Sequence, residues 1–312
     1  MRAVGTRARL TVGVTGRLAG AVLAASAALA ISPAAATAAS AATAATAASA
    51  ASTAAGPSGV AAKSAAVENA VTGTLLWSRG LNTERPMASI TKVMTAFIVI
   101  SAGDLNRTIT VPSAVIGYVL EWDASNAGLR PGDKLTARQL LYGMLLPSGA
   151  DAAYTLAEAY GPGLQAFIAR MNAAARLLGM TRTHFSNFDG LPYPTPYSNY
   201  STAADLLILG RAAMRSALFR SIVDQRTYRI TAGSGHHGYL WRNLNPLLGR
   251  YPGAIGIKPG YTGAAGQCLL FEATRNGYSV IGVTLDSLGS IDTVNVADPT
   301  RVLNWAFSLS AG

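Results

Sequence analysis

The sequence predicts an α/β fold in which both ends of the folded chain join one antiparallel sheet and the middle forms a helical insertion. A strand pair is indicated near the start, over residues 64–77, and a second near the end, over residues 268–286. Between these pairs, apolar residues recur at helical spacing. Sheet and insertion should form two lobes, and we expect an active-site cleft between them.

Turn signals define the two strand pairs. Residues 64–68 and 74–77 flank a turn at residues 71–73. Residues 268–274 and 279–286 flank an Asn-Gly dipeptide, which strongly favours a tight hairpin.

Cap residues mark the predicted helices. Thr136 and Gln139 fit a capping box before the first of them. A second helix has apolar residues at helical spacing over 164–171 and ends at Gly179. Thr202 indicates the cap of a third, together with the acidic residue three positions later.

The last predicted helix covers about residues 300–308. It follows the C-terminal strand pair in the chain.

The first 38 residues have the features of a secretory signal peptide. Four arginines and no acidic residue occur before a short apolar stretch over residues 18–31. Small residues at 36–38 then offer a cleavage site. An uncleaved anchor is the alternative, but the stretch is shorter than the roughly 20 residues that span a bilayer. We therefore expect a secreted, extracytoplasmic protein that has no stable membrane anchor.

The remaining chain divides into a linker and one domain. Residues 39–66 are almost entirely Ala, Thr, Ser, Gly and Pro, which predicts a flexible linker. Residues 67–312 then form the folded domain, which we expect to be a monomer.

The chain carries a moderate excess of positive charge. Loss of the four N-terminal arginines lowers the formal charge from +10 to +6. This excess suits association with an anionic envelope polymer, and an ordinary basic surface is the alternative interpretation. Nucleic acid is not an expected partner, because aromatic residues are few and no Lys/Arg-rich run occurs.

No metal or other cofactor is expected. His184, His236 and His237 are too scattered for a metal-ligand pattern. The single cysteine, Cys268, lies in an apolar run and is interpreted as a small buried hydrophobe rather than a nucleophile.

Ser89 and Lys92 form the first candidate catalytic motif. Pro86 precedes them and a buried helix face follows, so Ser89 should lie in the first turn of a helix with Lys92 on the same face. A serine nucleophile needs a base within hydrogen-bond reach, and this spacing provides one. Taken alone the motif is weak, and an ordinary N-cap with a solvated lysine is the alternative.

Lysine usage favours the catalytic interpretation. The chain has four lysines and 21 arginines, and Lys92 and Lys258 both lie in the motifs described here. Lysine can lose its proton when it is desolvated, whereas arginine cannot, so base catalysis requires lysine.

The second candidate is Ser148, in Pro147-Ser148-Gly149, between two predicted helices. Its loop could reach the cleft, and a plain helix cap is the alternative.

The third motif covers residues 256–263. Lys258 and Gly260 stand in it, and the glycine permits close approach of a ligand to backbone. Pro259 indicates an edge strand, because proline cannot donate to a strand ladder. A surface Gly-Pro loop is the alternative.

These three motifs resemble, in this order, the serine penicillin-binding and β-lactamase superfamily. Residues 83–96, 145–153, 184–191 and 256–263 are similar to the D-alanyl-D-alanine carboxypeptidase family of low-molecular-mass penicillin-binding proteins. The similarity extends over essentially all of residues 67–307. It implies a β-lactamase/transpeptidase-like fold, in the short form without the C-terminal β-domain and membrane-binding helix that this family often has.

The resemblance also implies a role for each motif residue. Ser89 would attack the carbonyl between two D-alanines at the end of a peptidoglycan stem peptide, with Lys92 as general base. Ser148 would relay the proton to the leaving D-alanine, and Lys258 would attract the terminal carboxylate. The backbone N–H groups of Ser89 and Tyr261 would form the oxyanion hole. Water or an amine would then accept the peptide, and β-lactams would be covalent inhibitors.

Three positions depart from the family pattern. Ala150 stands where the family usually has asparagine, and Pro259 stands where it has threonine. Asn295 falls where an arginine often assists carboxylate binding. Each loss removes a hydrogen bond worth about 1–3 kcal/mol, so we expect a slower or altered enzyme. Thr262 is the candidate for a replacement hydroxyl.

Two other functions stay open at the level of sequence. A β-lactamase shares the scaffold, but no Glu-x-x-Leu-Asn-like segment is present to hold a deacylating water. A degenerate module that binds stem peptides without turnover is the second, and Ala150 and Pro259 keep it under consideration.

Overall fold

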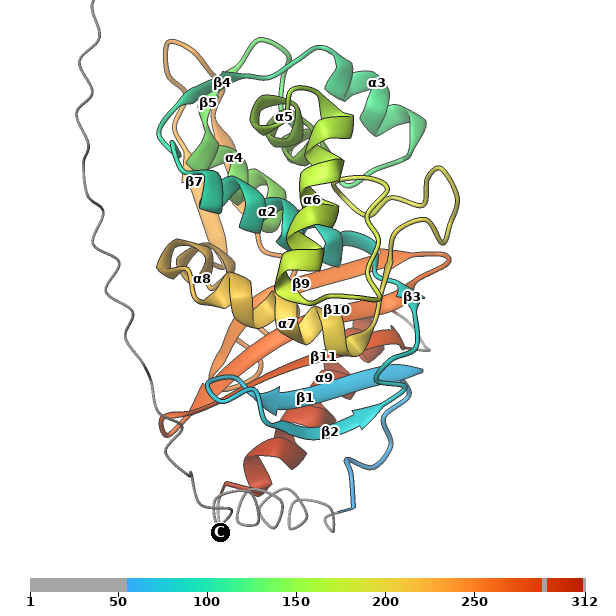
Figure 1. The fold of residues 1–312 in the computed structure, drawn as a ribbon. Coiled ribbons are helices and arrows are strands. Elements are labelled where there is room, and N and C mark those ends of the chain that lie inside the picture. Colours follow the sequence, from blue (N-terminus) through green and yellow to red (C-terminus); the bar gives the residue numbers. More distant parts are fainter. Residues whose placement is uncertain (1–54, 288–290, 311–312) are drawn as a thin grey trace, which may run out of the picture. The chain divides into compact units, whose positions relative to one another are not determined.

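A five-stranded antiparallel sheet joins the two ends of the folded chain (Figure 1). The computed structural model describes residues 55–287 and 291–310, without the side chains of residues 291–295. In spatial order the strands are β2 (Leu75–Arg79), β1 (Ser64–Asn69), β11 (Tyr278–Ser287), β10 (Gly266–Arg275) and β9 (Ala254–Thr262). The strand β9 is therefore an edge, as Pro259 predicts.

Helices pack against both faces of this sheet. α9 (Ile291–Ser308) packs against β10 and β11 on one face, and α7 (Ala203–Met214) and α8 (Ala217–Val223) lie on the other. The helical lobe comprises α2 (Thr91–Ala102), α3 (Ala114–Glu121), α4 (Ala137–Leu145), α5 (Ala150–Tyr160) and α6 (Leu164–Leu178).

Three short antiparallel ribbons complete the described part of the chain. They are β3 (Arg85–Pro86) with β6 (Tyr200–Ser201), β4 (Thr108–Thr110) with β5 (Lys134–Thr136), and β7 (Thr227–Ile230) with β8 (Tyr239–Arg242).

Local sequence signals account for several element boundaries. Asn276 and Gly277 both adopt positive φ between β10 and β11, as a tight hairpin requires. The Thr136 capping box is present, Gly179 ends α6 in the left-handed conformation, and the side chain of Thr202 caps α7. These predictions are confirmed.

The folded domain begins earlier than the predicted boundary after residue 66. The buried carboxylate of Asp298 accepts hydrogen bonds from the backbone N–H groups of Ala61 and Ala62, at 2.9 and 2.7 Å. The small side chains of β1 are buried because this strand lies inside the sheet, under helices on both faces. Their composition resembles that of a linker, although they form core.

The last helix is also longer than predicted. α9 begins at Ile291 rather than near residue 300, and it keeps Pro299 within its length. Proline lacks the N–H that continues a helix, so its position conceals the upstream turns from a sequence pattern.

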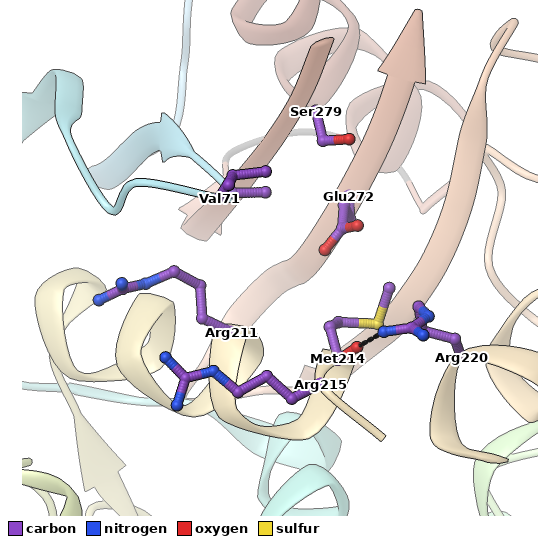
Figure 2. A pocket seen from close by; sticks show the side chains of 8 residues that line it. Val71, Arg211, Met214, Arg215, Arg220, Glu272 and Ser279 are labelled. Atoms are coloured by element: carbon purple, nitrogen blue, oxygen red, sulfur yellow. Dashed lines mark hydrogen bonds between the residues drawn. The ribbon is translucent and has the colours of Figure 1, made fainter. Parts of the chain in front are cut away.

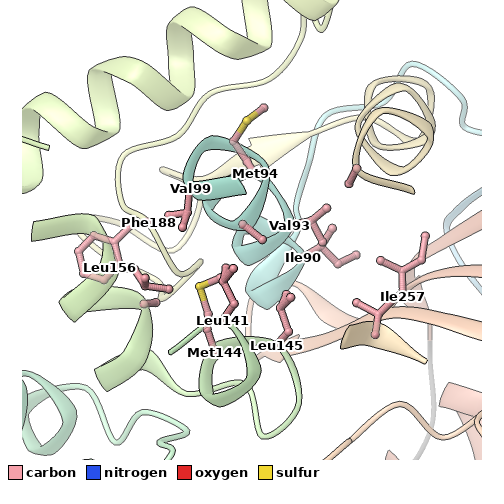
Figure 3. Close-up of a cluster of buried hydrophobic side chains, with 14 of the residues drawn as sticks. Ile90, Val93, Met94, Val99, Leu141, Met144, Leu145, Leu156, Phe188 and Ile257 are labelled. Atoms are coloured by element: carbon pink, nitrogen blue, oxygen red, sulfur yellow. The ribbon is translucent and has the colours of Figure 1, made fainter. Parts of the chain in front are cut away.

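The largest core cluster lies between the sheet and the helical lobe. Apolar side chains of α2, α4 and α5 meet there with Phe188 and Ile257 (Figure 3). This packing fixes α2, and with it the segment that carries Ser89 and Lys92. A smaller cluster fills the space between the sheet and α9.

The predicted signal peptide lies outside the described residues. Among the helices that the structure describes, none has the length and apolar character that crossing a bilayer requires.

Candidate active site

Ser89 lies in a single 3-10 turn, η1 (Ala88–Ile90), that leads directly into α2. The residue before it, Ala88, adopts a φ of +47°, a conformation that costs energy for any residue except glycine. Such strain persists only where the surroundings enforce it, and here it sets the direction in which Ser89 faces. The predicted first-turn position is thus close to what is observed.

Lys92 is buried beside Ser89 and makes two hydrogen bonds. Its Nζ donates to Ser89 Oγ at 3.0 Å and to the backbone carbonyl of Asp189 at 2.8 Å. Only 2% of its surface is exposed, so the alternative of a solvated lysine is wrong. Burial lowers its pKa, and the carboxylates of Asp189 and Asp151 partly oppose that effect. A lowered pKa makes the neutral amine, which can accept a proton, more accessible.

Asp189 belongs to a loop that closes over Lys92. Its buried carboxylate accepts a hydrogen bond from the hydroxyl of Tyr118 at 2.8 Å. Burial is the main cause that raises its pKa, and the charge of Lys92 acts against this. The sequence analysis did not single out Asp189 or Tyr118, since only the Asp-Gly dipeptide marks this turn.

The loop is fixed by hydrogen bonds to backbone. The amide of Asn187 donates to the carbonyls of Leu191 and Tyr193, both at 2.9 Å, and its oxygen accepts the N–H of Gly190 at 2.8 Å. The hydroxyl of Thr95, one turn beyond Lys92, donates to a loop carbonyl at 2.6 Å. The loop is therefore anchored to α2 itself.

Asp151 is the second carboxylate near Lys92. It is the second residue of α5, and its carboxylate accepts hydrogen bonds from the backbone N–H groups of Ala127, Leu129 and Ala152 at 2.8–2.9 Å. Burial is the largest effect on its pKa and raises it, whereas these hydrogen bonds lower it. The carboxylate thus fixes the 122–129 loop, which forms one wall of the cleft.

Lys258 lies in β9 and is completely buried. Its Nζ donates to the carbonyl of Pro259 at 3.2 Å. Burial lowers its pKa well below the ordinary value, and the positive charge of Lys92 adds to that effect. The two lysines are therefore close enough to repel each other, and two full charges in this space are disfavoured.

The end of β9 passes against the backbone of Ser89. A Cβ on Gly260 would lie 2.9 Å from the Ser89 nitrogen, so the position requires glycine. Pro259 pairs with Leu269 and cannot donate, so this pair is of the type without mutual hydrogen bonds. Tyr261 lies two residues on, and its N–H therefore points away from β10 toward the cleft.

A cleft of about 230 Å³ opens above these residues. Ser89 and Lys92 form its floor, Tyr261 and Thr262 come from β9, and Ala150 comes from the start of α5. Ser148 and Lys258 are not among its lining residues in the described chain; both are buried.

Ser148 is not a helix cap. The cap position of α5 is Gly149, without a side-chain hydrogen bond, and Ser148 adopts a φ of +64°. Its role as proton relay stays a prediction.

Thr262 lines the cleft, and its hydroxyl oxygen accepts a hydrogen bond from the N–H of Ala265 at 3.1 Å.

The cleft has an aromatic wall that the sequence analysis missed. Trp122 lines it and stacks on Tyr193, with ring centroids 4.7 Å apart. Tyr118 packs against the edge of the same tyrosine ring. These residues come from segments more than 70 positions apart, so no local pattern signals them.

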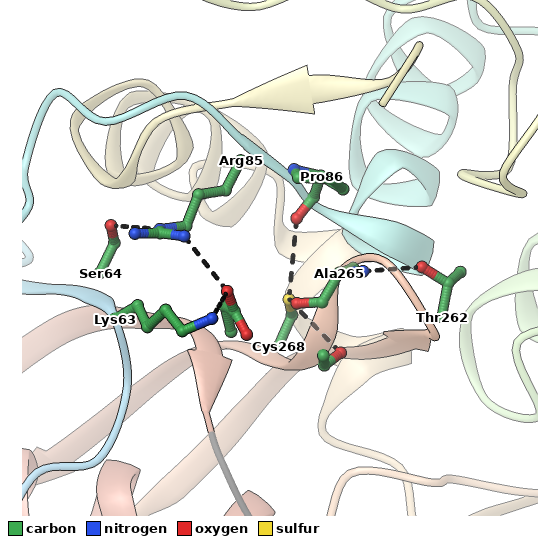
Figure 4. A network of polar contacts seen from close by, with 9 residues as sticks. Lys63, Ser64, Arg85, Pro86, Thr262, Ala265 and Cys268 are labelled. Atoms are coloured by element: carbon green, nitrogen blue, oxygen red, sulfur yellow. Dashed lines mark hydrogen bonds and ion pairs between the residues drawn. The ribbon is translucent and has the colours of Figure 1, made fainter. Parts of the chain in front are cut away.

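An ionic network holds the segment before Ser89 to the sheet (Figure 4). Arg85 bridges the hydroxyl of Ser64 at 2.8 Å and the carboxylate of Asp286 at 3.2 Å, and Lys63 pairs with the same carboxylate at 2.9 Å. Cys268 is buried next to this network, and burial raises its pKa to about 12. It is therefore a buried thiol, as predicted.

Comparison with known proteins gives consistent matches over the folded chain. A family model described as D-alanyl-D-alanine carboxypeptidase matches residues 49–289. The D-alanyl-D-alanine carboxypeptidase of Streptomyces sp. strain K15 is 41% identical over 262 residues, covering 80% of this chain and 88% of that protein. The D-alanyl-D-alanine carboxypeptidase DacB2 of Mycobacterium tuberculosis is 36% identical over 250 residues, covering 80% and 83%.

Comparison with solved structures finds a protein with a similar fold. The crystal structure of the Streptomyces K15 DD-transpeptidase has a TM-score of 0.76 and 40% identity to this chain, covering 82% of this chain and 100% of that one.

Gly190 gives a direct test of how the loop sets the site. It has a φ of +88°, and a Cβ there would lie 1.9 Å from the carbonyl oxygen of Ala88, so Gly190→Ala must displace the segment that carries Ser89. We expect Ser89 acylation by a penicillin to fall about 10²-fold, as small misplacements of reacting groups do. Gly163→Ala is the matched control, because Gly163 has a φ of +92° and open space around it. Equal acylation rates in the two variants would contradict the assigned role of the loop.

Proposed function

Because the chain belongs to the D-alanyl-D-alanine carboxypeptidase family, we propose that Ser89 is its catalytic nucleophile. The chain is a serine-type D-Ala-D-Ala carboxypeptidase, and its substrates are peptidoglycan stem peptides that end in D-Ala-D-Ala. The observation that carries the residue assignment is the 3.0 Å contact between Ser89 Oγ and the buried amine of Lys92. A base in hydrogen-bond contact with a serine is the arrangement that nucleophilic catalysis needs.

Lys92 takes the proton of Ser89 in the first step. Burial has lowered its pKa, and its neutral form has a lone pair available for the hydroxyl proton. The Ser89 oxygen then bonds to the carbonyl carbon of the penultimate D-alanine. Negative charge develops on the carbonyl oxygen and is stabilised by hydrogen bonds from the N–H groups of Ser89 and Tyr261.

Lys258 determines where the remaining proton resides. Lys92 and Lys258 each disfavour the charge of the other, so the pair holds one proton more readily than two. A substrate carboxylate near Lys258 favours the charge on that lysine. Substrate binding thereby leaves Lys92 neutral, which is the form that acts as base.

Collapse of the tetrahedral intermediate breaks the bond between carbonyl carbon and leaving nitrogen. The nitrogen takes the proton that Lys92 removed, with Ser148 as the proposed relay, and D-alanine leaves. Water then attacks the ester on Ser89 and restores the free hydroxyl, which gives a carboxypeptidase; an amine in place of water gives a transpeptidase.

At three positions this chain departs from the residue that the family usually has. Ala150 lines the cleft at the first residue of α5, where an asparagine would offer a hydrogen bond. Asn295 falls among the residues whose side chains are not described. We propose that the hydroxyl of Thr262 replaces the one lost at Pro259, since Thr262 lines the cleft.

We propose that the enzyme is secreted through its N-terminal segment and acts at the wall as a monomer. The family match and the D-Ala-D-Ala substrate support an extracytoplasmic site of action, and they favour a turning-over enzyme over an inactive binding module.

A covalent label tests the nucleophile. A fluorescent penicillin, which stands in for the D-Ala-D-Ala end, should label the purified protein in a band that persists on denaturing gels. Ser89→Ala should abolish this band, whereas Ser221→Ala, at an exposed serine on α8, should keep it. A folded wild-type protein without a band would support the binding module, and rapid hydrolysis of the label would support a β-lactamase.

Lys92→Arg tests the base. Arginine keeps its proton, so acylation by penicillin should fall about 10²-fold or more. In the wild type the acylation rate should rise with pH, with an apparent pKa below the ordinary lysine value of 10.5, because only the deprotonated amine accepts a proton. Lys134→Arg, at an exposed lysine, should leave rate and pH profile unchanged. A pH-independent rate in the wild type would exclude Lys92 as the base.

Thr262→Val tests the replacement hydroxyl. Valine keeps the shape and removes the hydroxyl, so acylation should slow about tenfold, and Thr262→Ser should retain the wild-type rate. If valine acylates as fast as wild type, Thr262 has no such role.

A further inference from the structure

A second cleft, of about 200 Å³, lies on the face of the sheet that α7 and α8 cover (Figure 2). It opens between the end of α7, the start of α8 and the strands β10 and β11. None of its lining residues belongs to the active-site cleft. Along β10, Glu272 in this cleft lies four residues from Cys268, which pairs with Gly260, and this separation is a rise of about 13 Å along the strand.

Glu272 is a buried carboxylate without a partner. Only 8% of its surface is exposed, and its side chain points into the cleft between Arg211 and Arg220. Within the described residues no hydrogen bond or ion pair reaches it; Arg220 acts on it only at longer range and donates instead to the carbonyl of Met214. Burial raises the pKa of Glu272 to about 7. Its carboxylate oxygens are not among the fully buried side-chain atoms that lack a partner, so they keep exposed surface in the cleft and a ligand can reach them.

Arg220 is the arginine of this cleft whose charge acts on the carboxylate of Glu272, whereas the guanidinium of Arg215 points away from Glu272 and from Arg220 (Figure 2). Arg211 is committed to Glu68, with Nε and Oε1 2.6 Å apart. Arg215, by contrast, has no side-chain hydrogen bond or ion pair within the described part of the chain, and Arg220 uses one of its five donors on Met214. Donors of Arg220 are thus free in this cleft, and so is the carboxylate acceptor of Glu272.

This arrangement selects among ligand classes. Glu272 would repel a simple anion, and the arginines would repel a simple cation. A group that carries an ammonium and a carboxylate on one carbon satisfies both sides at once, and its size fits the cleft. We propose that the cleft binds the zwitterionic head of an α-amino acid, with its ammonium on Glu272 and its carboxylate on Arg220.

Two kinds of molecule at the proposed site of action carry an ammonium and a carboxylate on one carbon. One is a free amino acid such as D-alanine, and the other is the unlinked end of a diamino acid in a wall peptide. The binding site stands apart from the residues of the proposed reaction, so its test uses the Ser89→Ala variant of the full chain and does not depend on turnover.

Calorimetric titration with D-alanine and with diaminopimelate tests the proposal and separates the sources. We expect saturable binding of at least one. Glu272→Gln and Arg220→Gln should each weaken it about ten- to a hundredfold, which is the effect of losing a charged hydrogen bond. Glu158→Gln and Arg176→Gln, at exposed residues elsewhere, are the matched controls and should bind as the parent does.

Fold and active site are checked in the same proteins. With Ser89 restored, Glu272→Gln should keep the thermal stability of the parent or exceed it, and penicillin should acylate it at the wild-type rate. Preference for D-alanine identifies the free amino acid as the source, and preference for diaminopimelate identifies the wall peptide.

Three results would overturn the proposal. They are no saturable binding of either probe, binding that survives both cleft substitutions, or acetate binding as tightly as D-alanine. The last result would indicate a plain anion site.

Discussion

The amine of Lys92 is enclosed between the hydroxyl of Ser89 and the backbone carbonyl of Asp189, at 3.0 and 2.8 Å. Keeping water from this amine lowers its pKa, and the proposed chemistry requires that shift. The enclosure depends on parts that are distant in sequence. The main core cluster fixes α2, a hydrogen bond from Thr95 fixes the 187–191 loop to α2, and Gly190 lets that loop lie against the segment before Ser89.

Buried charge must be balanced, and the two clefts do this differently. In the active site, Lys92 is buried near Asp151 and Asp189, and both carboxylates accept hydrogen bonds. Lys258 is buried near Lys92, whose charge disfavours its own. Lysine can lose its proton when it is buried, whereas arginine cannot. This explains why two of the chain's four lysines are buried in the active site, while most of its positive charges are arginines. In the second cleft Glu272 has no partner in the described chain, and a ligand is the simplest source of one.

Local signals predicted the parts of the structure that depend on neighbours in sequence. The hairpin at Asn276, the caps of α4 and α7, and the contact of Ser89 with Lys92 all follow from residues within four positions of each other. The Asp189 loop and the aromatic wall could not be predicted in this way, because they form between segments about 70 to 100 positions apart. The domain boundary was misplaced because small residues are typical of linkers and also of tightly packed strands.

The low number of lysines makes the central claim measurable. Protein labelled with ¹³C at lysine Cε gives four side-chain signals, and Lys92→Arg identifies the signal of Lys92. The account predicts that this signal titrates below 10.5, the ordinary value for lysine, in the free enzyme. A Lys92 signal that titrates at or above that value would mean that the buried amine stays protonated, and it would contradict the assignment of Lys92 as the base.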